Sequence, residues 1–140
     1  MGVLPKPQYP TLAVQALRIR QLFPDFKYSW ISGTGVWTGN LQPSSSSPRY
    51  FVQIMYKYLD RPTVRVLRPQ ICEDAPHIYG DGSLCLYYRD GSWTRSRMIA
   101  ETILPWAAEW LYFYEYWQAT GKWLGPEAPH TRKKEIFTDL

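Results

Sequence analysis

Three stretches in the first half of the chain alternate apolar and polar side chains, with only short loops between them. They cover residues 28–41, 50–58 and 61–69. A repeat of two residues is typical of strands that bury one face. The expected inward side chains are Val52, Ile54, Tyr56 and Tyr58 in the second stretch and Val64 and Val66 in the third. Because consecutive strands joined by short loops pair antiparallel, we predict a meander of three or four strands.

Two details refine this prediction. Glycines within residues 28–41 indicate a turn or a bulge there. The serines at 44–47 lie between two prolines, which is typical of a loop, and we interpret this segment as a hairpin connection rather than a linker between domains.

A helix is expected before the strands, over residues 11–23. Apolar side chains recur there every three or four positions, and Pro10 and Pro24 bracket the segment. The recurring residues are Leu12, Ala16, Ile19 and Phe23.

Helical patterns return after the strands. Thr94 or Ser96 is suited to cap a helix that runs toward Leu104, and Pro105 is expected to kink or restart it. From Trp106 to Ala119 aromatic side chains share one face, and Gly121 supplies a stop. With helices segregated from an antiparallel sheet, the predicted fold class is α+β.

Composition limits the partners and the compartment. The 140 residues are 45% hydrophobic and 20% charged, which fits one folded domain over residues 1–140. The net charge of +4 is spread over small separate groups, so we expect no nucleic-acid partner. No stretch reaches the roughly 18 apolar residues of a membrane span, and the N-terminus resembles no export signal. We therefore expect a cytoplasmic protein with reduced thiols and no membrane partner.

Cys85 raises the main chemical question, because it lies inside the hydrophobic sequence SLCLYY. If this segment is extended, Leu84, Leu86 and Tyr88 face the core. Ser83, Cys85 and Tyr87 then face outward. The Gly-Asp-Gly turn just before it, at residues 80–82, allows another chain to approach closely.

Several roles for this cysteine fit the residues alone. The possible metal ligands are Cys72, His77, Cys85 and His130, but they lack the paired spacing of zinc sites, so no metal and no cofactor is expected. A redox pair with Cys72 and a Cys–His dyad both lack their usual signatures. A passively packed thiol stays open for Cys85, and we expect that role for Cys72.

The sequence GSLCL, with Trp93 eight residues after the cysteine and then a helix, resembles the active-site region of ubiquitin-conjugating enzymes. In that family a His-Pro-Asn tripeptide precedes the cysteine, with the Asn eight positions before it. His77 occupies that position here, Gly82 matches the family's Gly and Leu86 its Leu. The resemblance covers about residues 11–119, so residues 120–140 would form a C-terminal extension.

The departures from the motif point to a bacterial branch. His77 replaces the Asn and Ala75 replaces the family's His. Together with the aromatic C-terminal part, these changes make the chain most similar to the conjugating-type proteins of CBASS antiphage operons. A bacterial ubiquitin-like modification operon is the other setting that it resembles.

The resemblance implies a fold and an activity. The fold would be that of ubiquitin-conjugating enzymes, with a flap that carries the motif. Cys85 would carry the C-terminal glycine of a cargo protein as a thioester and pass it to an amine. His77 would be an oxyanion donor, a general base or a structural brace. Tyr79, Asp81 and Gly82 would support the loop, with Asp81 also suited to be a simple turn residue, and Trp93 would pack beneath it.

The implied partners are a cargo protein and an activating enzyme. The cargo would be a cGAS-like cyclic-nucleotide synthase or a ubiquitin-like protein, and any activating enzyme would be a separate protein. Two alternatives from other classes remain open. One is a catalytically inactive binding module of the same fold, and the other is a nucleic-acid binder that stacks bases on exposed aromatic rings.

Overall fold

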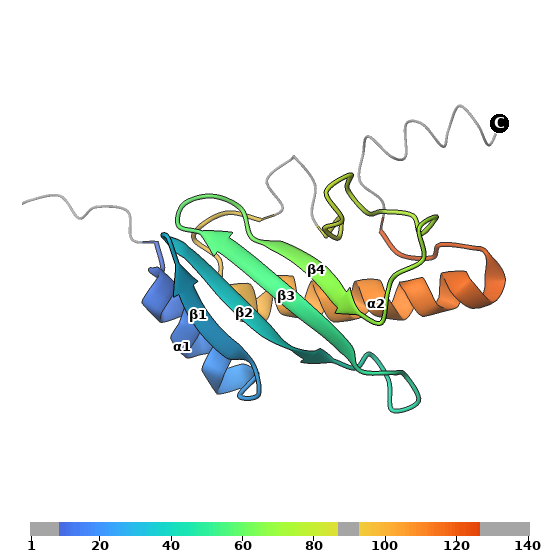
Figure 1. The fold of residues 1–140 in the computed structure, drawn as a ribbon, viewed down its shortest axis with the longest axis horizontal. Helices are drawn as coiled ribbons and strands as arrows, with labels where there is room; N and C mark the ends of the chain where they lie inside the picture. The colour runs from blue at the N-terminus through green and yellow to red at the C-terminus, as the bar shows by residue number, and fades with distance from the viewer. Residues whose placement is uncertain (1–8, 87–92, 127–140) are drawn as a thin grey trace, which may run out of the picture.

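The structure, a computed structural model, describes residues 9–86 and 93–126. Seven elements follow one another along the chain (Figure 1): helix α1 (Leu12–Leu22), strands β1 (Lys27–Ile31), β2 (Thr34–Leu41), β3 (Tyr50–Lys57) and β4 (Thr63–Arg68), a short 3-10 helix η1 (Ile99–Glu101), and helix α2 (Ile103–Thr120). The α+β class is therefore confirmed.

The four strands form one antiparallel sheet in the order β1-β2-β3-β4, so the predicted meander is also confirmed. The stretch 28–41 divides into β1 and β2 at a two-residue turn. Ser32 and Gly33 both have positive φ angles there, 49° and 80°, which matches the turn type that follows the natural twist of hairpins.

The predicted inward faces are correct with one exception. Val52, Ile54, Tyr56 and Val64 are fully buried, and Val66 packs against the core. The predicted inward orientation of Tyr58 is wrong, because β3 ends at Lys57 and Tyr58 is 40% exposed.

Helix α1 forms as the sequence predicts. Thr11 caps it by accepting a hydrogen bond from the Val14 N–H at 3.2 Å. The side chain of Ile19 is buried, and the other three predicted apolar residues pack against the same core.

The predicted helix over residues 94–104 is wrong. The hydroxyls of Thr94 and Ser96 lie 2.7 Å apart and bond to each other instead of capping a helix. Within residues 94–102, only the three residues of η1 are helical, and α2 begins at Ile103. Pro105 neither kinks nor restarts α2, because it is the third helical residue, where a backbone N–H has no partner within the helix.

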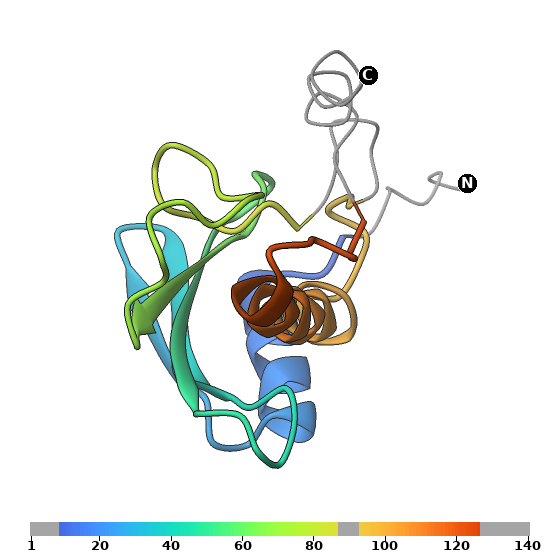
Figure 2. The same ribbon diagram turned by 90° about the vertical axis from the view of Figure 1, so that its right-hand side faces the viewer.

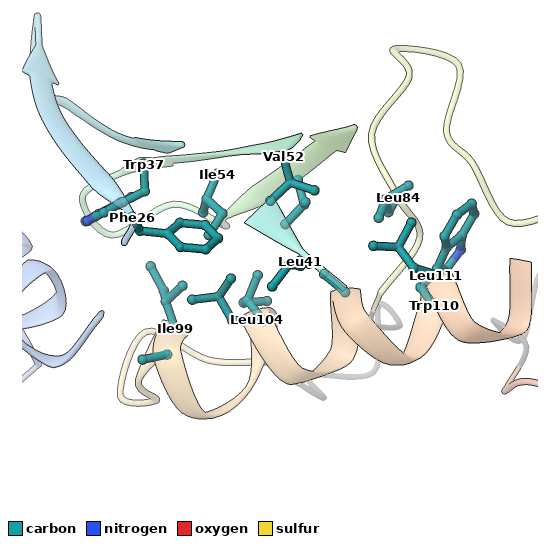
Figure 3. Packing of buried hydrophobic residues seen from close by; sticks show 14 of the residues in the cluster. Phe26, Trp37, Leu41, Val52, Ile54, Leu84, Ile99, Leu104, Trp110 and Leu111 are labelled. Carbon is teal, nitrogen blue, oxygen red and sulfur yellow. The ribbon is translucent and has the colours of Figure 1, made fainter. Parts of the chain in front are cut away.

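Both helices cover one face of the sheet, as the view in Figure 2 shows. The aromatic stripe of α2 faces the sheet: Trp110 and Tyr114 are buried, while Trp106 and Trp117 are partly buried against the core. Figure 3 shows this packing, with Leu104 and Leu111 of α2 beneath side chains of the sheet. Gly121 ends the helix with a φ of 77°.

One polar side chain in the core was not expected from the sequence. Gln15 of α1 is completely buried. Its amide nitrogen donates to the Arg97 carbonyl at 3.0 Å, and its amide oxygen accepts from the Ile99 N–H at 2.9 Å. This side chain therefore joins α1 to the segment that enters η1.

Among the described helices, none is both long and apolar enough to cross a membrane.

Candidate functional site

The spacing of eight residues between His77 and Cys85 has a structural cause. Residues 77–85, called the 77–85 loop from here on, fold back on themselves as a small hairpin. The Cys85 N–H donates to the His77 carbonyl at 2.9 Å, and Ile78 and Leu84 form an antiparallel bridge. The Tyr79 N–H donates to the Ser83 carbonyl at 2.8 Å. His77 and Cys85 are therefore cross-strand neighbours.

The tip of the loop is a polar turn. The Asp81 carboxylate accepts hydrogen bonds from the Ser83 hydroxyl at 2.6 Å and from the Ser83 N–H at 2.9 Å. These bonds, and the Arg65 guanidinium, hold the pKa of Asp81 below its ordinary value. Gly82 has a φ of 88°, which an L side chain rarely adopts. Asp81 is thus the turn residue that its sequence suggests. Ser83 is buried, so its predicted outward orientation is wrong.

The loop is anchored on both sides. Toward the sheet, the Leu84 N–H donates to the Val64 carbonyl of β4 at 2.8 Å, and Arg65 forms an ion pair with Asp81 at 3.3 Å. Toward the helix, the Trp110 indole N–H donates to the His77 carbonyl at 3.1 Å. Figure 3 shows Leu84 directed toward Leu111 and Trp110 of α2. A loop held by two elements keeps its side chains in fixed positions.

His77 is buried, with 8% of its surface exposed, and it has an unusual backbone. Its φ angle is +61°, a left-handed conformation that Asn, Asp and His adopt more readily than other L residues. Its imidazole packs on the Trp123 ring, with 4.8 Å between the centroids. Its carbonyl accepts bonds from both Cys85 and Trp110. Through its backbone, His77 therefore contributes to the position of Cys85.

Cys85 is half-buried. It donates a hydrogen bond to the Tyr79 hydroxyl, with 3.3 Å between sulfur and oxygen. Burial raises the pKa of Cys85 above its ordinary value, and the contact with Tyr79 opposes that rise. The partly buried surroundings of Cys85 therefore disfavour the thiolate, and the Tyr79 hydroxyl favours it.

One family model matches this chain. It is described as Type II CBASS E2 protein, and it covers residues 15–131. The chain belongs to this Type II CBASS E2 family. The match includes the whole 77–85 loop and Trp123. No curated protein matches the chain. Membership in the CBASS E2 family gives the chain an E2-like role in antiphage defence, with partners among the proteins of CBASS operons.

Within this CBASS E2 chain, two sequence expectations need comment. The thiol of Cys72 is exposed, so the prediction of a packed thiol is wrong. The backbone of Cys72 is fixed instead, because its N–H donates to the Tyr114 hydroxyl at 2.9 Å. Trp93 is buried, with its ring edge against Tyr56 of β3 and its N–H donating to the Thr102 hydroxyl at 3.0 Å. These contacts lie on β3 and at the start of α2, and packing beneath the loop stays a prediction.

From the sequence we expect no metal site, although Cys72, His77, Cys85 and His130 are possible ligands. No group of three His, Cys, Asp or Glu side chains within residues 9–86 and 93–126 is arranged to hold a metal ion. His130 lies outside the described residues, as do Tyr87 and Tyr88.

Sequence reasoning missed two tryptophans of the site. Trp110 was assigned to the core stripe of α2, and its bond to the His77 carbonyl depends on a fold-back that no local pattern reveals. Trp123 follows the helix stop at Gly121, in the segment expected to be an extension. Its ring nevertheless contacts both His77 and Trp110. The only sequence signal was a large aromatic residue placed shortly after a helix end.

Proposed function

We propose that this CBASS E2 protein carries the C-terminal glycine of a partner protein as a thioester on Cys85 and transfers it to an amine. The observation that carries the proposal is the placement of Cys85. This half-buried cysteine lies at the end of a doubly anchored loop, opposite the residue that stands at the family's Asn position. In this proposal the 77–85 loop is the flap of a ubiquitin-conjugating fold.

The chemistry of a thiol with a raised pKa suits an acyl carrier. A basic thiolate is a strong nucleophile when formed, so it can accept an acyl group from another thioester. A basic thiolate is also a poorer leaving group, so the thioester on the enzyme is cleaved less readily before transfer. Cys85 is only partly buried, and in this proposal a protein tail reaches its sulfur from solvent.

The cargo in this proposal is a protein of the same defence operon with a C-terminal glycine. The family assignment favours the cGAS-like synthase, with a ubiquitin-like protein as the other choice. A separate activating enzyme supplies the activated C-terminus. His77 holds the loop through its backbone, and Asp81 and Gly82 form the turn.

The proposal is tested by intact-protein mass spectrometry under denaturing, non-reducing conditions after co-expression with the neighbouring operon genes. Wild type should carry a protein-sized adduct that thiol treatment removes. The Cys85→Ser variant should trap a thiol-resistant ester, and Cys85→Ala should carry nothing. The matched control is Cys72→Ser, because Cys72 is the more exposed thiol, and this change should leave the adduct intact.

An adduct that persists on Cys85→Ala, or that Cys72→Ser abolishes, would contradict the proposal. A second candidate, a binding module without catalysis, rests on the burial of the His77 ring against Trp123. It would replace the first if no variant formed an adduct while a partner protein still copurified in a defined stoichiometry.

A further inference from the structure

The hydroxyl of Tyr79 is the side-chain group that hydrogen-bonds the Cys85 sulfur, at 3.3 Å. The two residues are six positions apart, and the hairpin brings them together. The Tyr79 N–H is bonded to the Ser83 carbonyl, and the Tyr79 carbonyl accepts from the Gly82 N–H at 2.9 Å. Both backbone groups of Tyr79 are thus fixed within the turn, which limits where its ring can lie.

The charge state of the sulfur determines which partner donates. A thiol donates weakly to the phenol oxygen, as in the structure. A thiolate has no proton to donate, so the phenol must turn its O–H toward the sulfur. Hydrogen bonds to an ionised group are roughly twice as strong as neutral ones. The contact therefore favours the thiolate over the thiol, against the effect of burial.

Tyr79 is also accessible, since 40% of its surface is exposed. This exposure distinguishes Tyr79 from the buried His77, whose ring packs on Trp123. The Tyr79 hydroxyl is in direct hydrogen-bond contact with the Cys85 sulfur.

We propose that Tyr79 is a catalytic residue that donates its phenol O–H in a hydrogen bond to the Cys85 thiolate whenever the sulfur carries neither a proton nor an acyl group. This inference rests on the proposed acyl transfer. It assigns Tyr79 a function at the reacting atom, beyond support of the loop or contact with an incoming chain.

The hydrogen bond acts in both half-reactions. In loading, the Cys85 proton passes to water and the thiolate attacks the glycine carbonyl of a cargo thioester, forming a new C–S bond and expelling the donor thiolate. In discharge, a primary amine attacks the same carbon, a C–N bond forms, the C–S bond breaks and the amine proton passes to water. Cys85 leaves as a thiolate, and the Tyr79 hydroxyl stabilises it at that moment.

The test measures the pH dependence of Cys85 alkylation by iodoacetamide, followed by intact mass in a Cys72→Ser background so that one thiol reacts. No cargo is needed, so the result is independent of whether conjugation occurs. We expect Tyr79→Phe to raise the midpoint of the profile by about half a unit to one unit, and to lower the rate at pH 7.5 about three- to tenfold. The matched control is Tyr112→Phe, on the exposed face of α2, which should leave the profile unchanged.

The direction of the shift separates the proposal from simple damage to the loop. Loosening the loop would expose the thiol and move its midpoint downward, toward that of a free cysteine, with faster alkylation. Loss of a hydrogen bond to the thiolate moves the midpoint upward, because the thiolate is then less stable relative to the thiol. A downward shift or no shift in Tyr79→Phe would overturn the proposal.

Conjugation then provides a second readout. If the alkylation midpoint rises as expected, discharge of the preformed thioester to a small amine should be about three- to tenfold slower in Tyr79→Phe. An upward alkylation shift without any adduct on wild type would contradict the conjugating function while leaving the Tyr79–Cys85 hydrogen bond established.

Discussion

His77 has a backbone conformation that most L residues adopt only at a cost. At a φ of +61°, a side chain with a Cβ is typically disfavoured by about 1–2 kcal/mol, and Asn and His are among the residues that tolerate it best. The family motif places Asn at this position, and this chain places His. Asn and His both suit such a backbone, and we expect the exchange to require no proton transfer by the ring.

Three substitutions at position 77 separate the effect of backbone strain on the reaction from the effect of the imidazole side chain. His77→Asn should retain most of the conjugating activity. His77→Gly and His77→Ala both remove the ring and its packing on Trp123, but only Gly is relaxed at this φ angle. We expect discharge by the Gly variant to be about fivefold faster than by the Ala variant, which corresponds to about 1 kcal/mol of backbone strain. The rates are read from loss of the thioester adduct over time.

Equal impairment of the Gly and Ala variants, with Asn also impaired, would show that the imidazole itself acts in the reaction. Circular dichroism of each variant serves as the control for folding.

Among the elements, the long connection between β2 and β3 is fixed by one glutamate of α2. The Glu115 carboxylate accepts from the Ser47 hydroxyl at 2.8 Å and from the Tyr50 hydroxyl at 2.7 Å. Burial, and then this bond to Glu115, raise the pKa of Tyr50 well above its ordinary range. The serine-rich loop is thus tied to the helix and shares its stability.

Glu115→Gln should therefore destabilise the protein. The amide can accept only through its single oxygen, so its NH₂ group would face the other of the two hydroxyl groups. We expect a loss of about 1–3 kcal/mol in the free energy of unfolding, measured by urea denaturation. Glu109→Gln, an exposed glutamate on the same helix, is the control and should cost less than about 0.5 kcal/mol. Equal losses in both variants would show that the helix charge matters and the bonds to the loop do not.

The elements differ in how well their sequences predict them. The apolar repeats in α1, β2, β3 and α2 are sufficient to predict these elements, because each element buries one continuous face. The helix expected at residues 94–104 was wrong because cap residues are also turn residues, and Thr94 and Ser96 bond to each other. For the candidate site, the sequence indicated Cys85 and its spacing from His77, and the catalytic role of both residues stays a prediction. The tryptophans of the site were not indicated, since Trp110 and Trp123 reach the 77–85 loop through tertiary contacts.

In the whole molecule, α2 and the sheet connect two regions that are held by different kinds of contact. At one end, the buried Gln15 ties α1 to the entry of η1, within the core. At the other, the 77–85 loop is held on β4 partly by the exposed ion pair of Arg65 with Asp81. Groups buried in the core open only with global unfolding, whereas surface loops open locally. The site should therefore loosen without loss of the fold.

Native-state hydrogen exchange should reveal this difference with two variants. Gln15→Met leaves the Arg97 carbonyl and the Ile99 N–H buried without their partner, which typically costs about 2 kcal/mol. Amides across β2 and β3 should then exchange about thirtyfold faster, because they exchange through global unfolding. Arg65→Gln removes an ion pair that is partly exposed, with a smaller effect of at most about 1 kcal/mol. It should speed exchange at the Tyr79 and Cys85 amides by up to about fivefold and leave the β3 amides unchanged. If Arg65→Gln accelerated exchange throughout the sheet, the loop and the core would form one cooperative unit, and the site could not open independently of the fold.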